Sequence, residues 1–314
     1  MSTPTVTRPS SRSASPRGGG RAVAASTRDT IAGWAFVAPL ILGISLFNLY
    51  PMMLSLYSSF TSWNGFGTHD WIGLQNFATI SKDDIFWQTL RNTLYFTAFT
   101  IPLTMSIAFL MALLCNNRHL RARGFFRTVF FTPFVTNVVA ISLIWSQLYT
   151  PGTGLIAKVL AIFGIEGPSW LTSSTWAMPA VIIVAVWHGI GFPMLIMLSA
   201  LQGIPNPIYE AAEIDGARGL ARMFRITLPL ISPQIFFVLI TQIIATFQVF
   251  GIIFVMTKGG PANQTSVYIY NLYQKGFILG QLGYASALAW LLFILILAMT
   301  FIQLRIQKRW VFYG

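Results

Sequence analysis

Six long segments of this 314-residue sequence contain no Asp, Glu, Lys or Arg. These charge-free segments are residues 30–69, 92–117, 128–157, 167–209, 226–257 and 276–304. A helix needs about 20 apolar residues to cross the hydrocarbon core of a bilayer, and each segment holds at least 26 residues. Only 9% of the residues are charged, compared with about 25% in an average soluble protein. This composition excludes an ordinary water-soluble enzyme and predicts an all-α, polytopic membrane protein.

The charge-free segments predict six membrane-spanning helices. We place them at residues 31–59, 91–115, 125–148, 177–202, 233–256 and 285–306. Residues 1–28 are rich in Ser, Arg, Gly, Pro and Ala, so they cannot bury a core and are expected to form a disordered basic tail. Residues 29–314 are expected to form one transmembrane domain, which includes a long loop at 203–232.

The distribution of basic residues predicts the orientation of the chain. Fifteen of the twenty Lys and Arg residues fall on one side of the predicted topology, in the N-terminal tail, two loops and the C-terminal end. Cytoplasmic loops of membrane proteins collect Lys and Arg, so both termini are expected to be cytoplasmic. The net charge of +12 therefore needs no nucleic-acid partner to explain it, although the basic tail could touch anionic lipid headgroups.

Several function classes lack the residues that they need. A nucleotide-binding P-loop requires a Gly-Lys pair, and the sequence contains none, so the chain cannot hydrolyse ATP by that route. Three histidines and the single Cys115 form no spaced metal-ligand set, and no catalytic constellation is visible. An ion- or proton-coupled transporter would want Asp or Glu inside its spans, and the charge-free segments hold none. We expect no catalytic residue, no metal and no cofactor bound by this chain.

The loop at 203–232 has an unusual pattern for a membrane-protein connection. Pro207 stands at the start of a short predicted helix that carries Glu210, and Gly216 allows a break after it. A second, basic helix follows at about 217–226 and ends near Pro229. On physical grounds alone, the pair could equally be an amphipathic connector lying on lipid headgroups.

The loop resembles the EAA motif of ATP-binding-cassette (ABC) importer permeases, E-A-A-x3-G-x9-I-x-L-P. The matching residues are Glu210, Ala211, Ala212, Gly216, Ile226, Leu228 and Pro229. The resemblance implies the type I importer permease fold, with this loop as a coupling helix that docks in a groove of the ATPase subunit. Glu210 would make a polar contact at that joint, Ala211 and Ala212 would allow close approach, and Asp215 and Arg218 belong to the same surface.

A second set of motifs resembles the carbohydrate-uptake branch of these permeases. Its T-x-G-G-P…T segment matches Thr257, Gly259, Gly260, Pro261 and Thr265, and its G-L-x-N-aromatic loop matches residues 73–77. This branch is typified by the first permease of maltose and glycerol-phosphate importers. Many relatives have Phe-Asp before the first segment, whereas this chain has Phe250-Gly251, so a polar group near the outer end of the fifth span is missing.

The resemblance also implies partners. They are a second, usually different, permease subunit, an ABC ATPase dimer that binds ATP-Mg, and an extracytoplasmic solute-binding protein. The chain itself would lie in a bacterial cell membrane as a multi-pass protein.

Polar side chains inside the predicted spans are candidates for a solute pathway, because such groups are costly in a membrane and often functional. They are Asn137, Trp187, His188, Gln242 and Gln248. Amides and an aromatic ring suit a sugar, but the same groups could simply form interhelical hydrogen bonds worth about 0.6 kcal/mol each. The absence of Lys and Arg from the charge-free segments favours a neutral carbohydrate over glycerol 3-phosphate, although a partner subunit could supply a cation.

Overall fold

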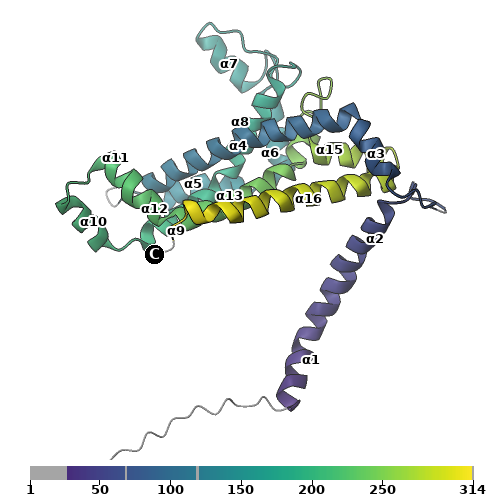
Figure 1. Ribbon diagram of the computed structural model, residues 1–314. Helices are drawn as coiled ribbons and strands as arrows, with labels where there is room; N and C mark the ends of the chain where they lie inside the picture. The colour runs from purple at the N-terminus through teal and green to yellow at the C-terminus, as the bar shows by residue number, and fades with distance from the viewer. Residues whose placement is uncertain (1–26, 68, 118–119, 313–314) are drawn as a thin grey trace, which may run out of the picture. The chain divides into compact units, whose positions relative to one another are not determined.

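The computed structural model describes residues 27–312 except 68 and 118–119 (Figure 1). The described residues form helices, and one isolated bridge pairs Thr61 with Trp71. The helices in chain order are α1 (Thr27–Ile44), the π-helical turn η1 (Ser45–Leu49), α2 (Tyr50–Ser58), α3 (Gln75–Lys82), α4 (Asp84–Asn116), α5 (Arg123–Val135), α6 (Val138–Leu148), α7 (Leu155–Ile162), α8 (Ala177–Gly189), α9 (Gly191–Gly203), α10 (Asn206–Ile214), α11 (Gly219–Arg222), the π-helical turn η2 (Met223–Thr227), α12 (Leu228–Leu230), α13 (Ser232–Phe247), α14 (Gly251–Met256), α15 (Tyr268–Tyr273), the π-helical turn η3 (Gln274–Ile278), α16 (Leu282–Ile306) and the 3-10 turn η4 (Gln307–Arg309). The predicted tail, residues 1–28, lies outside the described residues except for its last two, which begin α1.

The chain divides into two units, residues 1–53 and 54–314. In the first unit, α1 and η1 lead into α2 and form most of a 29-residue apolar helix that continues to Ser58. Its apolar side chains are exposed, including Trp34 (65%) and Phe36 (88%). A helix with apolar side chains exposed all round suits an environment of lipid or of another apolar chain rather than water.

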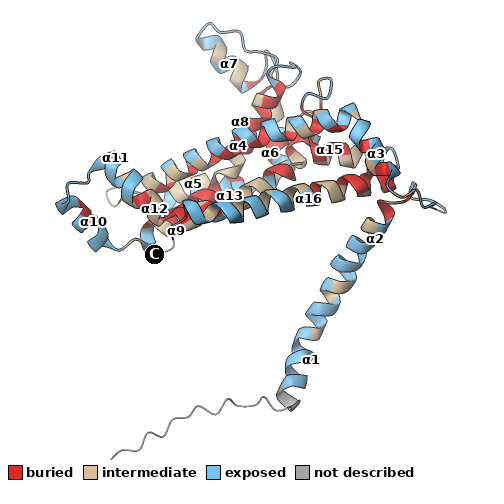
Figure 2. Cartoon of the chain, in the orientation of Figure 1, coloured by how far each residue is buried: buried red, intermediate tan, exposed pale blue. Residues whose placement is uncertain are grey.

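The second unit is a helical bundle built around α4, which packs against α8, α9, α13 and α15. Small side chains allow this close packing. On α4 they include Thr93, Thr104, Ala108 and Ala112, all nearly inaccessible. Figure 2 shows the buried residues gathered along the centre of the bundle, between α4, α8, α13 and α16. The three buried apolar clusters of this unit draw on helices far apart in the sequence.

Two predicted spans are bent. Within the described residues, four helices are long and apolar enough to cross a membrane, or up to six if each bent pair counts as one span. The predicted span at 125–148 corresponds to α5 and α6, which lie at 98° to each other. Pro133 lies in the last turn of α5, and the Asn137 side chain caps α6 by accepting a hydrogen bond from the Val139 amide at 2.8 Å. Similarly, the predicted span at 177–202 corresponds to α8 and α9, which meet at 43°.

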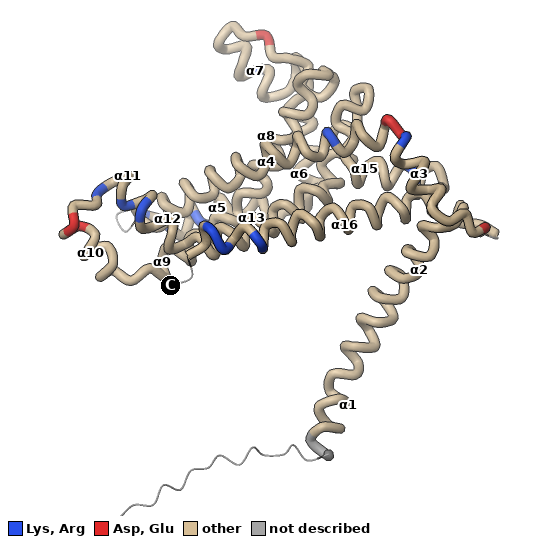
Figure 3. The backbone as a smooth tube through the Cα atoms, in the orientation of Figure 1, with Lys and Arg blue, Asp and Glu red and all other residues tan. Residues whose placement is uncertain are grey.

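Charged residues in the bundle gather toward its two ends (Figure 3). One end carries α10 and α11, and the other carries α3 (Figure 1). This pattern has the physical form expected of a membrane protein, with charges in the aqueous regions and an uncharged middle.

Candidate functional site

The EAA segment folds as a short helix with a glycine-dependent end. α10 begins at Asn206, one residue before the predicted start at Pro207. At its other end Gly216 has φ +79°, and the Ala217 amide donates to the Ala212 carbonyl at 2.8 Å. A left-handed glycine with this backward hydrogen bond is a common helix terminus. The side chains of Glu210 and Ala211 are exposed, whereas Ala212 is buried.

The segment formed by α11, η2 and α12 is a second helical arm, which contacts α10 through Tyr209. The Tyr209 hydroxyl lies 3.3 Å from the Thr227 hydroxyl, and the Arg222 guanidinium stands 5.5 Å from the Tyr209 ring. Ile214 (87% exposed) and Phe224 (60%) project from the two arms. Together, α10 and this arm form a projection from the bundle. Its surface has exposed charges and exposed apolar side chains, which suits binding in a groove of another protein.

The remaining predicted coupling residues fall into two groups. Asp215 and Arg218 are exposed at the tip of the projection, beside Gly216. Ile226, Leu228 and Pro229 are half-buried at its base, where the chain enters α13. The first group is available for contact with another molecule, and the second anchors the projection to the bundle.

The T-x-G-G-P…T segment makes a self-contained turn. The buried Thr265 hydroxyl donates to the Gly260 carbonyl at 2.6 Å and lies 2.7 Å from the Thr257 hydroxyl. Gly259 has φ +80°, and a Cβ there would stand 2.8 Å from the Tyr270 ring. Pro261 is half-buried in the same turn. The geometry gives these residues a structural role, since their polar groups are used within the turn.

Two of the five predicted pathway residues come together. His188 on α8 and Gln242 on α13 line a cavity of about 200 Å³ in the middle of the bundle. His188 hydrogen-bonds the backbone of Thr136. Its Nε2 atom, like the Thr100 and Thr104 hydroxyls that also line the cavity, is buried without a hydrogen-bond partner within the described part of the chain. Buried polar atoms without partners are costly, so this cavity is suited to a ligand or water that supplies hydroxyl groups.

The other three pathway candidates lie outside that cavity. Asn137 and Gln248 are exposed and stand at the ends of α6 and α13. Trp187 is 40% exposed and meets the Trp145 ring edge-on at 5.5 Å. Polar groups exposed within a span favour a neighbouring chain or a water-filled pathway over lipid.

A close contact explains why this chain has Phe250-Gly251 at the position where many relatives have Phe-Asp. A Cβ at Gly251 would stand 2.9 Å from Val138 Cγ1. Because α14 starts this close to α6, an aspartate does not fit unless the Val138 side chain or one of the two helices shifts. Gly251 thus permits a close helix contact in this chain.

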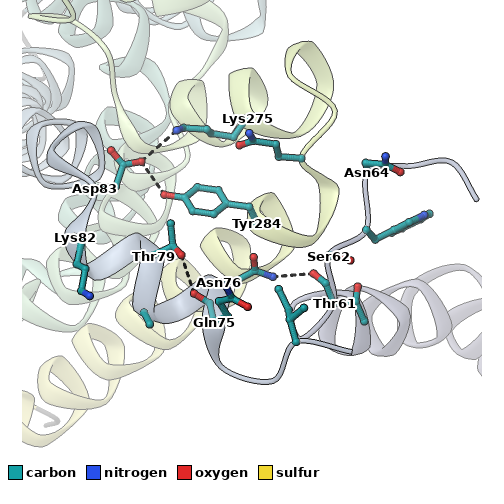
Figure 4. A pocket seen from close by; sticks show the side chains of 14 residues that line it. Thr61, Ser62, Asn64, Gln75, Asn76, Thr79, Lys82, Asp83, Lys275 and Tyr284 are labelled. Atoms are coloured by element: carbon teal, nitrogen blue, oxygen red, sulfur yellow. Dashed lines mark hydrogen bonds and ion pairs between the residues drawn. The ribbon is translucent and has the colours of Figure 1, made fainter. Parts of the chain in front are cut away.

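A polar cleft that the sequence pattern does not predict lies at the α3 end of the bundle (Figure 4). Its volume is about 830 Å³. It is lined by polar side chains from three segments: Thr61, Ser62 and Asn64; Gln75, Asn76, Thr79, Lys82 and Asp83; and Lys275, Gln281 and Tyr284. Asn76, from the G-L-x-N-aromatic motif, supports one wall because its amide donates to the Ser59 and Thr61 carbonyls, both at 2.9 Å. This motif is thus the one sequence feature that indicated the region of the cleft.

Asp83 is the central charged group of the cleft wall. It accepts hydrogen bonds from the Tyr284 hydroxyl at 2.7 Å and from the Ile85 amide at 2.9 Å, and it pairs with Lys275 at 3.2 Å. Burial alone would raise the pKa of Asp83, but the contacts with Tyr284, Lys275 and Ile85 together hold the pKa below its ordinary value. Asp83 is therefore an ionised, fully partnered carboxylate at neutral pH.

Residues 104–312 match the family described as "Binding-protein-dependent transport system inner membrane component". The chain belongs to this family. It is 36% identical over 291 residues to the probable ABC transporter permease protein YesP of Bacillus subtilis, covering 91% of this chain and 93% of YesP. It is 36% identical to the lactose transport system permease protein LacF of Rhizobium radiobacter, with 86% and 92% covered. The sn-glycerol-3-phosphate transport system permease protein UgpA of Agrobacterium fabrum is 33% identical, with 91% and 98% covered.

A solved structure shares the fold of this permease. A chain of a bacterial alginate ABC transporter, crystallised with an alginate pentasaccharide-bound periplasmic protein, matches with a TM-score of 0.79 at 23% identity, covering 90% of this chain and 95% of that one. The all-α, multi-pass fold is therefore that of an ABC transporter permease, and the family makes the chain a transport subunit. No group of three or more His, Cys, Asp or Glu that could hold a metal occurs within residues 27–312 as described.

Proposed function

We propose that this permease carries a neutral carbohydrate inward, driven by a separate ATPase subunit. The observation that carries the proposal is the intramembrane cavity of His188 and Gln242, which offers amide, imidazole and hydroxyl groups and no charge. A carbohydrate presents many hydroxyls that both donate and accept hydrogen bonds, so it would satisfy the partnerless atoms of Thr100, Thr104 and His188.

The orientation in this proposal places α10 in the cytoplasm. Both termini lie on that side, since Arg and Lys concentrate there and the span count is even. The α3 end with its polar cleft then faces outward. Residues 1–26, which hold four of the N-terminal arginines, would add to the cytoplasmic positive charge.

In this proposal, the helical projection that carries Glu210 couples the permease to ATP hydrolysis. An ATPase dimer that holds ATP-Mg receives Ile214, Phe224 and the exposed Glu210 in a groove, and its closure moves α10 together with the arm fixed to it by Tyr209. The half-buried Ile226, Leu228 and Pro229 pass this movement to α13, which carries Gln242. Alternating access of the cavity follows from this connection.

A second permease subunit completes the pathway in this proposal. Asn137, Trp187 and Gln248 are exposed on the part of the bundle expected to be intramembrane, where a polar surface toward lipid is costly. We place the second chain, of the same or a different sequence, against these residues. The solute then passes between the two chains, with His188 and Gln242 at the edge of the pathway.

Glycerol 3-phosphate is the alternative solute, since UgpA relatives are named for its transport. No Lys or Arg lines the His188 cavity, and an anion buried without a cation is strongly disfavoured. The chemistry of the cavity therefore favours an uncharged sugar.

The test is the ATPase activity of the assembled transporter in lipid nanodiscs. Solute-binding proteins loaded with sugars or with glycerol phosphates are added to wild type, to Glu210→Lys and to Glu166→Lys, a matched charge reversal at an exposed glutamate that follows α7. We expect stimulation by one sugar-loaded binding protein, retained in Glu166→Lys and reduced at least tenfold in Glu210→Lys. Stimulation by the glycerol-phosphate form alone would overturn the solute assignment, and full activity of Glu210→Lys would overturn the coupling role.

A further inference from the structure

We propose that a cavity at the first turns of α4 binds the phosphate group of a membrane phospholipid, with Arg91 as the residue that pairs with the phosphate. The cavity has a volume of about 250 Å³. Its polar lining comes from three segments: Arg91, Asn92 and Tyr95 on α4; Ser174 and Thr175 just before α8; and Gln264 in the turn between α14 and α15. The inference uses the proposed orientation, in which this end of α4 is the outer one, and it does not depend on the solute.

The charge of the cavity favours an anionic ligand. Within the described part of the chain, Arg91 forms no ion pair, and no Asp or Glu lines the cavity. Asp84, the one acidic residue of α4, lies two turns earlier, about 10 Å along the helix axis. It is exposed beside Lys82, and Asp83 is already paired with Lys275. The positive charge of Arg91 is therefore not neutralised by an acidic residue of its own helix.

The length of α4 places Arg91 at the depth of lipid headgroups. The helix has 33 residues and is about 50 Å long, whereas the hydrocarbon core of a bilayer is about 30 Å thick. With the excess shared between the two ends, Arg91, which stands about 10 Å from the start of α4, lies where the core meets the headgroups. Lipid phosphates lie in this same interfacial region.

The surface of α4 next to Arg91 favours a lipid over a free phosphate. Tyr95 (44% exposed), Phe99 (49%) and Leu103 (46%) follow Arg91 at intervals of four residues, so they form one exposed row on the helix. The Tyr95 and Phe99 rings lie against each other, with centroids 4.7 Å apart. An apolar row that begins at a cation suits an acyl chain whose phosphate is bound by that cation, whereas a free phosphate ester would leave the row uncovered.

The neutral donors of the cavity are held in place before a ligand arrives. The Asn92 amide donates to two carbonyl oxygens of the turn that carries Gln264, both at 2.8 Å, so this turn is fixed to α4 next to Arg91. The side chains of Gln264, Ser174 and Thr175 are exposed and can donate to the phosphate oxygens that Arg91 does not reach. A site formed in advance avoids part of the entropy cost of binding.

The experiment counts lipids on the assembled, detergent-purified transporter by native mass spectrometry. Three probes are titrated: phosphatidylglycerol, which is anionic; phosphatidylcholine, whose ammonium group offsets its phosphate; and free glycerol 3-phosphate. Arg91→Gln removes the cation, and Ser174→Phe fills the cavity while it leaves Arg91 in place. Lys82→Gln is the matched control, because it removes an exposed positive charge from the end of the preceding helix, α3, outside the cavity.

We expect the wild type to hold a phosphatidylglycerol whose affinity falls about tenfold in Arg91→Gln and in Ser174→Phe, as for loss of a hydrogen-bonded charge pair near the membrane surface. The affinity should be unchanged in Lys82→Gln. Phosphatidylcholine should bind the wild type more weakly, and glycerol 3-phosphate should not displace the phosphatidylglycerol, since it cannot cover the apolar row.

The contrary results are distinct. If Arg91→Gln and Ser174→Phe bind phosphatidylglycerol as tightly as Lys82→Gln does, the site is wrong. If glycerol 3-phosphate displaces the lipid at comparable concentration, the ligand is a free phosphate ester and the assignment to a lipid is wrong. Because the lipid count requires neither ATP nor a solute-binding protein, failure of the proposed transport function would appear only in the ATPase assay and would leave this test unaffected.

Discussion

The Tyr284 hydroxyl donates a hydrogen bond of 2.7 Å to Asp83, although 201 residues separate the two in the sequence. Asp83 also caps the N-terminus of α4 through the Ile85 amide and pairs with Lys275 on η3. One carboxylate thus joins α4, η3 and α16 at the end of the bundle that carries the polar cleft. This connection fixes the relative positions of α4 and α16 at that end.

Removing the tyrosine hydroxyl should destabilise the permease. We expect Tyr284→Phe to lower the free energy of unfolding by about 1.5 kcal/mol, since a hydrogen bond to a charged group is lost while Lys275 still pairs with Asp83. Denaturant titration in mixed micelles measures this difference. Tyr95→Phe, which removes a hydroxyl from an exposed position on α4, is the control and should change stability by less than about 0.5 kcal/mol. Equal effects of both variants would contradict the connection.

Protonation of Asp83 should remove the same stabilisation. Because the folded-state pKa of Asp83 lies below its ordinary value of 3.8, the stabilising contribution is complete above that value and is lost as the pH falls through the folded-state pKa. We expect the thermal-stability difference between wild type and Asp83→Asn to be constant from about pH 7 to 5 and to shrink at lower pH. A difference that already shrinks near pH 6 would show that another group is responsible.

Gly283 should tolerate no side chain, because the loop that forms the cleft passes directly over it. We expect Gly283→Ala to lower stability by about 1–3 kcal/mol through overpacking. Gly203, at the end of α9, has open space around it, so Gly203→Ala is the matched control and should be nearly neutral. Thermal unfolding of the two purified variants compares them, and a Gly283→Ala protein as stable as the control would exclude close packing at this position.

Substitutions in the intramembrane cavity should reduce solute transport without changing how the binding protein docks. We expect His188→Phe and Gln242→Leu to reduce solute uptake into proteoliposomes roughly 10-fold or more, as for loss of one or two buried hydrogen bonds of 1–3 kcal/mol. Half-maximal stimulation by the binding protein should stay at the wild-type concentration. Gln248→Leu removes a similar amide outside the cavity, and a larger effect of this control than of Gln242→Leu would place the pathway elsewhere.

Some of the candidate sites could be predicted from local sequence. The EAA segment can be recognised from the sequence because its glycine, alanines and proline all belong to one short helix pair within about 20 residues. The T-x-G-G-P…T segment can also be recognised from the sequence, but its structural role cannot. The hydrogen bonds of Thr265 show a structural turn, and nothing in the residue pattern distinguishes such a turn from a binding loop.

What the sequence determined alone is the class of protein and the approximate positions of its spans. Transfer of a segment into lipid depends on its own composition, so charge-free segments long enough to cross a bilayer are a local property. Tertiary structure decided the meeting of His188 with Gln242 and the contact of Asp83 with Tyr284. Each of these depends on which helices pack together, and packing is set by close contacts such as Gly251 with Val138, which no single segment encodes by itself.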